Sequence, residues 1–213
     1  ASGGEGDDPE NDTRPGNGAR MSGHFTLTGN HVLKILVGQL GGTGTSTSNK
    51  AGGGGGGSFV YNTSTNSPLI VAAGGNGENW RSWTTNGPDG QATNNGTTSG
   101  GGVGGRGGGG GGLSSNGANY SGSMGGQSFT NGGVGGLRYS SEFADGGFGG
   151  GGGSRYEGGG GGGYHGGKAS ETNQYTINYP HYGAGSYNSG NNQDNSAGVN
   201  VGHGKVVITF LSN

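Results

Sequence analysis

The sequence predicts an all-β fold with almost no α-helix, into which a bundle of extended glycine helices is inserted. Short segments with the repeat of a β-strand lie near both ends of the chain. Glycine makes up 63 of the 213 residues and hydrophobic residues only 24%, and four glycine runs have nearly equal lengths. No segment shows a helical repeat of apolar residues, and glycine is unfavourable inside α-helices.

Six segments carry the strand signals. Alternating apolar residues or short β-branched runs occur at 24–28 (HFTLT), 31–37 (HVLKILV), 58–61 (SFVY), 68–73 (PLIVAA), 174–179 (QYTINY) and 204–211 (GKVVITFL). A period of two places alternate side chains on opposite faces of a sheet. Glycine, asparagine and serine fill the connections, which is typical of turns.

These strands bracket the glycine-rich part of the chain. They lie over about 20–73 and 174–213, on either side of a middle of about 74–173 that is rich in Gly, Ser, Asn and Thr. We therefore expect a single glycine-rich domain over 1–213, in which the first and last strands pair and hold the middle as a structured insertion. The alternative is a flexible linker, because so few apolar residues can bury little surface.

The lengths of the glycine runs favour rods over a linker. The runs from Gly52 to Gly57, from Gly107 to Gly112 and from Gly158 to Gly163 have six residues, and the run from Gly149 to Gly153 has five. A linker has no reason to keep a fixed run length, whereas rods that lie side by side do. The run at 52–57 falls between two predicted strands and adds a further rod to the bundle.

The rod that we predict is the threefold extended helix, which is called polyglycine II when every residue is glycine. It rises about 3.1 Å per residue, so six residues span roughly 19 Å, and it has no internal hydrogen bonds. Its N–H and C=O groups point outward, and glycine at every position lets neighbouring rods approach closely enough to exchange hydrogen bonds. The cost is the conformational entropy of glycine, so only several packed rods are expected to be stable.

The stretch GGFGGGGGSRYEGGGGGGYHGGK at 146–168 shows the pattern most clearly. We expect two antiparallel rods, turned back at Ser154–Glu157, with Tyr156 and Tyr164 at their ends. Three aromatic residues, Trp80, Trp83 and Tyr156, are candidate contact residues for a partner because so small an apolar core cannot hide them all. The alternative is that they cap the ends of the rods.

The sequence offers no catalytic or cofactor-binding site, and we do not expect an enzyme. The five histidines are scattered, there is no cysteine to support a zinc site, and no carboxylate pair has a recognisable catalytic context. The glycine runs match dinucleotide-binding fingerprints trivially, without the strand–helix context that these need. A net charge of −2 and a single Arg-Gly-Gly give no case for nucleic-acid binding, and no apolar stretch is long enough for membrane insertion.

Two features of the sequence are candidates for ligands or modification. Asp8, Glu10 and Asp12 alternate as in a calcium loop, but the central glycine and the downstream bidentate glutamate are missing, so a solvated acidic loop is the alternative. Four Asn-x-Ser/Thr sites permit glycosylation in a secreted chain. They lie at Asn11, Asn62, Asn95 and Asn119.

Five motifs occur in an order that resembles a known family. They are VLKILVGQLGG (32–42), AGGGGGGSFVY (51–61), PLIVAAGGNG (68–77), GGFGGGGGSRYEGGGGGGYHGGKAS (146–170) and GHGKVVITF (202–210). This order is similar to the glycine-rich extracellular domain of anaplastic lymphoma kinase and leukocyte tyrosine kinase, and to related glycine-rich secreted and surface proteins. The resemblance implies a β-sandwich like that of tumour necrosis factor, with an inserted bundle of polyglycine II helices. In the two receptors the domain binds small protein ligands.

The departures from the family suggest how this chain works. The receptor domains contain disulfides, whereas this chain has no cysteine. Members of the family usually begin with one more strand. Ala1 of the present chain corresponds to a position just after the end of that strand. A strand from another subunit that fills this edge would build a filament, and a processed or truncated product is the alternative.

These considerations lead to one expected function and one alternative. We expect a non-enzymatic, extracellular structural or adhesive module, secreted or at the cell surface, that assembles into a fibre or matrix as a homo-oligomer or filament. The alternative is a protein-ligand-binding domain of a cell-surface receptor or adhesin. Phage tail-tip adhesins, which also use polyglycine bundles, rank third because they lack the strand motifs.

Overall fold

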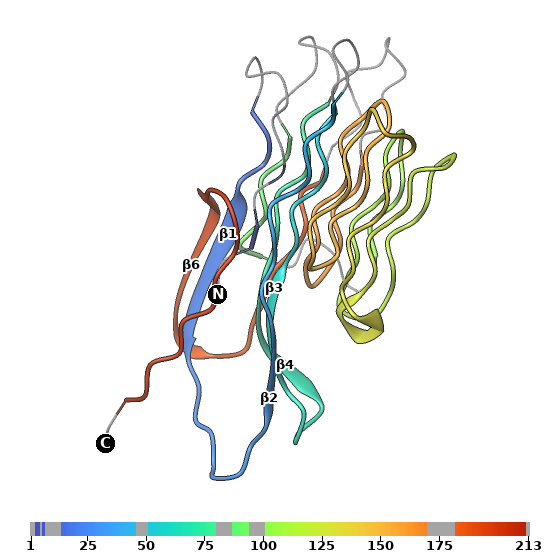
Figure 1. The fold of residues 1–213 in the computed structure, drawn as a ribbon. Helices are drawn as coiled ribbons and strands as arrows, with labels where there is room; N and C mark the ends of the chain where they lie inside the picture. The colour runs from blue at the N-terminus through green and yellow to red at the C-terminus, as the bar shows by residue number, and fades with distance from the viewer. Residues whose placement is uncertain are drawn as a thin grey trace.

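The computed structural model describes residues 3–4, 6, 14–45, 51–79, 87–93, 101–169 and 182–211. Within these residues the regular structure is nearly all β, which confirms the predicted all-β class, and the one helix is a short 3-10 turn at Phe129–Asn131. The strands are β1 (Gly18–His24), β2 (Leu33–Leu36), β3 (Ser58–Asn62), β4 (Ser67–Ala72), β5 (Tyr187–Asn188) and β6 (Asn191–Asn200). Figure 1 shows β1 and β6 together on one side, β2 to β4 in the centre, and the glycine-rich segments running side by side beyond them.

The strands form two antiparallel sheets. One has four strands in the order β2-β3-β4-β5, and the other consists of β1 and β6. In the larger sheet Ile35 lies opposite Val60, and Val60 lies opposite Ile70. In the smaller sheet Gly18 lies opposite Asn200 and Met21 opposite Asn195. The first and last strands of the structure therefore pair, but they are not the segments 24–28 and 204–211 that the sequence predicted for this pairing.

Two small apolar clusters form on the sheets. Because adjacent residues of a strand face opposite sides, Val60 enters one cluster and Phe59 the other. Phe59 stacks on Phe129 with the ring centroids 4.9 Å apart. The first cluster joins β1 to the larger sheet and contains Ala19, Met21, Val60, Ile70, Ala72, Ala73 and Ala184, and the second contains Leu36, Phe59, Val71 and Phe129.

Of the six predicted strands, three agree with the structure, those at 24–28 and 204–211 do not, and the sixth is not tested. The segments predicted at 31–37, 58–61 and 68–73 correspond to β2, β3 and β4. Residues 25–28 of the segment predicted at 24–28 are irregular, because β1 ends at His24. The segment predicted at 174–179 lies outside the described residues.

The largest correction concerns the C-terminal strand. Among the described residues, 206–211 belong to no sheet, and the last strand is β6, whose sequence NNQDNSAGVN is almost entirely polar. β6 is a strand because its backbone pairs with β1 from Asn191 to Asn200, with two register shifts on the way. A strand depends on a backbone partner as much as on its own residues, so an apolar alternation alone did not identify it.

The glycine run at 52–57 is bonded laterally, with a period of three. Each N–H group of residues 52–57 donates to a carbonyl of a segment that is distant in sequence. Gly52 and Gly55 donate to Glu78 and Gly75, respectively. Gly53 and Gly56 donate to Gly42 and Gln39. Gly54 and Gly57 donate to Gly152 and Gly149. The acceptor numbers fall as the donor numbers rise, so all three acceptor segments run antiparallel to residues 52–57.

The run at 158–163 repeats the pattern, with a difference on one side. The N–H groups of Gly159 and Gly162 donate to Gly52 and Gly55, respectively. Those of Gly160 and Gly163 donate to Gly108 and Gly111. Both of these neighbours run parallel to it. On its third side two asparagine side chains accept the hydrogen bonds, Asn79 Oδ1 from Gly158 and Asn76 Oδ1 from Gly161, each at 2.9 Å.

Glycine is needed in these runs because the segments lie in backbone contact. Every residue of the runs at 52–57, 107–112, 149–153 and 158–163 is buried. A Cβ atom built on Gly160 lies 2.1 Å from the carbonyl oxygen of Gly167, and one on Gly54 lies 2.2 Å from that of Gly160. The runs at 149–153 and 158–163 are direct neighbours of opposite direction, joined by a 2.8 Å hydrogen bond from Gly152 N–H to Gly160 C=O.

Candidate functional site

Many of the residues that the sequence singles out lie where the structure gives no description. The calcium candidates Asp8, Glu10 and Asp12, the glycosylation candidates Asn11 and Asn95, and the aromatic residues Trp80 and Trp83 lie outside the described residues. Calcium binding therefore stays a prediction. Within the described ranges no group of three or more His, Asp or Glu side chains is arranged to hold a metal ion.

The two described glycosylation candidates have different environments. Asn62 is 2% exposed, its Nδ2 lies 3.0 Å from His31 Nδ1, and its Oδ1 accepts from the N–H groups of Ser64 and Thr65. These bonds hold the turn between β3 and β4, so a glycan on Asn62 requires that turn to open. Asn119 is exposed, and its Oδ1 accepts from Gly125 N–H. Asn119 is therefore the more accessible of the two.

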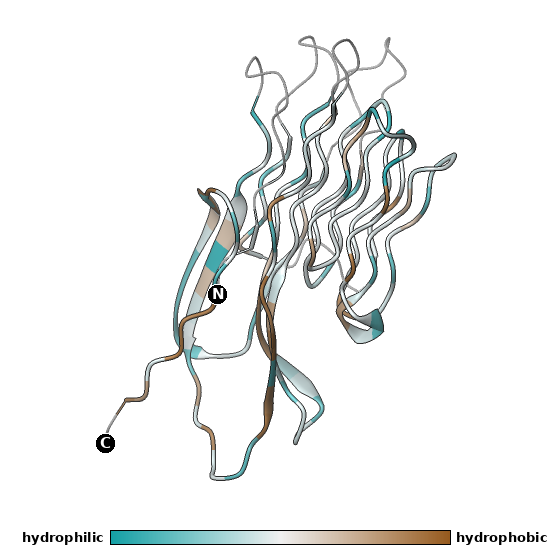
Figure 2. Cartoon of the chain, viewed as in Figure 1, coloured by the Kyte–Doolittle hydropathy of each residue, from teal (hydrophilic) through white to brown (hydrophobic). Residues whose placement is uncertain are grey.

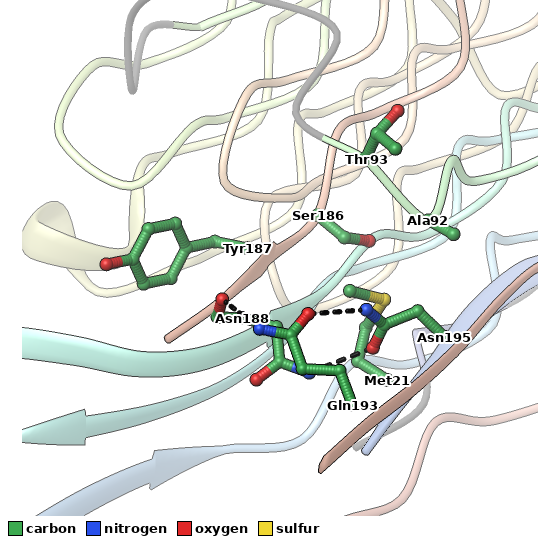
Figure 3. A pocket seen from close by; sticks show the side chains of 8 residues that line it. All are labelled: Met21, Ala92, Thr93, Ser186, Tyr187, Asn188, Gln193 and Asn195. Atoms are coloured by element: carbon green, nitrogen blue, oxygen red, sulfur yellow. Dashed lines mark hydrogen bonds between the residues drawn. The ribbon is translucent and has the colours of Figure 1, made fainter. Parts of the chain in front are cut away.

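An open pocket of about 310 Å³ lies between β5, β6 and the segment at 92–93. Figure 3 shows amide side chains across its floor: Asn188 donates to Asn195 Oδ1 at 2.8 Å, and Asn195 donates to Gln193 Oε1 at 2.9 Å. The lining side chains are uncharged, being those of Met21, Ala92, Thr93, Ser186, Tyr187, Asn188, Gln193 and Asn195. The residues that line this pocket therefore supply no acid, base or cation for catalysis.

An arginine–aromatic cluster lies at one end of the glycine bundle, around the turn at 154–157. The Arg155 guanidinium carbon lies 4.2 Å from the ring centroid of Tyr139 and 4.9 Å from that of Tyr156. Phe143, which is 3% exposed, meets the Tyr156 ring edge to face at 5.8 Å. Tyr156 is 37% exposed, so the ring both covers the end of the bundle and faces solvent. Sequence reasoning singled out Tyr156 but missed Arg155, Tyr139 and Phe143.

Exposed apolar side chains lie on and beside β2 and on the C-terminal segment at 206–211. Figure 2 shows both as predominantly hydrophobic. Ile35 of β2 is 45% exposed, and the residues on either side of the strand, Val32 and Val37, are 62% and 40% exposed. In the C-terminal segment the exposed side chains are Val207 (71%), Ile208 (51%), Phe210 (94%) and Leu211 (67%). Exposed apolar residues gathered in this way mark an interaction surface. Alternating apolar residues at 204–211 mark this segment in the sequence, where they predict a paired strand and not an exposed segment.

The two described ion pairs contribute little to stability. The two ion pairs among the described residues, Arg20 with Asp194 at 3.0 Å and Arg138 with Asp145 at 3.7 Å, have side chains that are 42–70% exposed. Exposed pairs of this kind contribute about 0–1 kcal/mol each. In the part of the chain that the structure describes, no helix has the length and apolar character needed to cross a bilayer.

A comparison with protein-family models and with curated proteins finds no match to this chain. The resemblance to the glycine-rich domains of two receptor kinases therefore stays a prediction. The bonded glycine bundle, the arginine–aromatic cluster and the apolar surface of β2 and residues 206–211 are the features from which a function can be argued.

Proposed function

We propose that this protein is a non-enzymatic structural or adhesive module that acts outside the cell and assembles into a fibre or matrix. Its body is a bundle of polyglycine II helices inserted in a β-sandwich, as in the glycine-rich extracellular family that the sequence resembles. Copies associate by addition of a strand from one subunit to the sheet of another. The observation that carries the proposal is the lateral bonding of the buried glycine runs, together with an apolar strand surface left open to solvent.

The three-residue period supports the polyglycine II assignment. A helix with three residues per turn directs every third N–H group to the same neighbour, and the donors at residues 52–57 repeat with that period. The carbonyls of Gly52, Gly54 and Gly56 accept from Gly159, Gly147 and Gly4, which belong to further segments. One run is thus tied to neighbours on all sides, and this arrangement resists bending without bulky side chains.

The two sheets support the sandwich. The first apolar cluster contains Ala19 and Met21 of β1 and Val60 and Ile70 of the larger sheet, so the two sheets share one core. The cluster is small and rich in alanine. The bundle then adds stability through its satisfied backbone groups, since nearly every buried N–H and C=O must find a partner.

Electron microscopy of the purified protein tests the assembly directly. We expect filaments at micromolar concentration, and a monodisperse monomer at all concentrations would contradict the proposal. Circular dichroism tests the body independently: we expect a spectrum of the polyproline II type that is lost in one cooperative melt. A featureless spectrum without a melt would indicate a flexible linker instead.

The arginine–aromatic cluster favours a second candidate function, the binding of a protein ligand by a surface receptor or adhesin. Tyr139 and Tyr156 are 45% and 37% exposed beside the Arg155 guanidinium, and tyrosine and arginine are enriched at binding hot spots. Replacing both tyrosines by serine separates the two candidates. Loss of adhesion to cells with unchanged filaments favours ligand binding at this cluster, whereas unchanged adhesion opposes it.

A further inference from the structure

We propose that residues 206–211 are a donor strand and that the outer edge of β2 in a second copy of this chain is its acceptor. This inference rests on the proposed function, because it names the two surfaces through which the copies join. It concerns the apolar segment near the C-terminal end of the described chain and an edge of the larger sheet that is unpaired among the described residues.

The donor has the properties of a strand without a partner. Its sequence VVITFL is rich in β-branched and aromatic residues, which favour strands. Within the described residues it belongs to no sheet, and Phe210 is 94% exposed. Val206 alone is partly buried, against the first apolar cluster. Exposing a run of large apolar side chains is unfavourable in water, so this segment has a strong drive to be covered.

The base of the donor is fixed to the body of the protein. Gly204 N–H donates to Gly38 C=O at 2.9 Å, and Leu40 N–H donates to His203 Nδ1 at 3.1 Å. Gly202 has a φ of +77°, a conformation that favours glycine and turns the chain just before the donor. Beyond this point the C-terminal segment leaves the body of the molecule, as Figure 1 shows. The donor is therefore held at one end and projects outward.

The acceptor is the outer edge of the larger sheet. β2 is one of the two terminal strands in the order β2-β3-β4-β5. Thr63 N–H donates to Val32 C=O at 2.9 Å, and backbone bonding alternates along an antiparallel pair. The backbone groups of Leu33 and Ile35 therefore point away from β3. An edge of this kind, flanked by the exposed side chains of Ile35 and Val37, is a template for another strand.

A second copy is the occupant because each chain presents both parts at once. In one copy the donor is directed away from its own body while the edge of β2 is open (Figure 1). The apolar character of the edge matches that of the donor, whereas the other end of the larger sheet, β5, has only two residues and β6 of the smaller sheet is polar. A contact between two different surfaces of identical chains does not close on itself by necessity, so it can extend into a filament.

A peptide experiment tests strand addition without requiring filaments. A fluorescent peptide containing KVVITFL is titrated into the full chain carrying Ile208→Asp and Phe210→Asp, which disable its own donor. We expect saturable binding, and at least a tenfold weaker affinity for the same peptide N-methylated at alternate residues. The methylated peptide keeps its side chains but loses backbone donors, so equal binding of both peptides, or of neither, would overturn the proposal.

Disulfide trapping tests the identity of the acceptor, and the absence of native cysteine leaves no background. Chains carrying Ile35→Cys are mixed with chains carrying Val207→Cys, Ile208→Cys or Thr209→Cys in turn and then oxidised. We expect crosslinked heterodimers with a preference for alternate donor positions. Asn191→Cys, at an exposed position of β6, replaces Ile35→Cys in the control and should crosslink much less.

The outcomes separate this inference from the proposed function. A chain that carries both cysteines, oxidised at high dilution, serves as the intramolecular comparison. If only this chain forms the disulfide, or if no position crosslinks, a second copy is not the acceptor. Filaments that persist in the Ile208→Asp, Phe210→Asp chain would overturn the donor assignment while the proposed function stands. Peptide binding and crosslinking without filaments would support the strand exchange and contradict a fibre.

Discussion

The side-chain oxygen of Asn79 accepts a 2.9 Å hydrogen bond from the backbone N–H of Gly158. Asn76, three residues earlier, makes the same contact to Gly161, and its Nδ2 donates to Lys168 C=O at 2.8 Å. The spacing of three matches the period at which the run at 158–163 presents its N–H groups. Two side chains thus take the place of a neighbouring backbone on one side of the run.

Replacing Asn79 by alanine should therefore destabilise the whole domain. Gly158 is buried, so its N–H would lose its partner without gaining water, at a cost of about 1–3 kcal/mol. We expect a fall in Tm of about 2–4 °C for each kcal/mol lost, measured by thermal melting. Asn191→Ala, at an exposed position of β6, is the control and should melt like the wild type. Equal melting of both variants would show that the Asn79 bond contributes nothing.

Gly160→Val tests whether the runs pack against one another. A Cβ at Gly160 lies 2.1 Å from Gly167 O, whereas one at Gly29 meets nothing within 4 Å. We expect Gly160→Val to lower the free energy of unfolding by about 3 kcal/mol or more, because rigid backbone must move. Gly29→Val should change it little in the same denaturant titration. Similar effects of the two substitutions would contradict lateral packing.

Arg155→Lys tests the arginine–aromatic cluster. Lysine keeps the charge but lacks the planar guanidinium that lies 4.2 Å from the Tyr139 ring centroid. We expect a loss of about 1 kcal/mol in chemical denaturation, within the range of cation–π contacts. Arg20→Lys, which can still pair with the exposed Asp194, is the matched control. A loss that is no larger for Arg155→Lys than for Arg20→Lys would argue against stabilisation by stacking.

The stability of the domain should depend weakly on salt. Its described ion pairs are both exposed, and salt screens exposed charges strongly but leaves uncharged backbone hydrogen bonds almost unaffected. We expect the Tm to shift by no more than about 2–4 °C, equivalent to about 1 kcal/mol, between low salt and molar sodium chloride. A much larger fall in Tm on adding salt would reveal ion pairs that matter more than these two.

Part of the architecture was predictable because it follows from local pattern. The strands β2, β3 and β4 lie where short apolar runs occur, since their side chains enter the two clusters directly. Glycine at every position of the runs predicted close approach of the backbone, and a Cβ on Gly160 has no room beside Gly167. Both inferences depend on residues that are neighbours in sequence.

The features from which the function is proposed depend on partners far away in sequence. β6 is a strand because it lies beside β1, although its residues are polar. Residues 206–211 have the residues of a strand but no partner within the described chain. The Arg155 guanidinium lies over the rings of Tyr120 and Tyr139, which belong to other turns. No local motif predicts these contacts. The contacts between Asn79 and Gly158 and between Asn76 and Gly161 likewise join residues about eighty positions apart.

The sequence by itself determined the all-β class, the places of the central strands and the need for glycine in the four runs. These properties follow from the period of the side chains and from the space that a Cβ occupies. Only the tertiary structure decided which backbone groups bond to which segment, which side chains accept hydrogen bonds in place of backbone carbonyls, and which apolar segment stays exposed. Hydrogen bonds between distant segments depend on direction and distance in space, and a linear order of residues does not specify either.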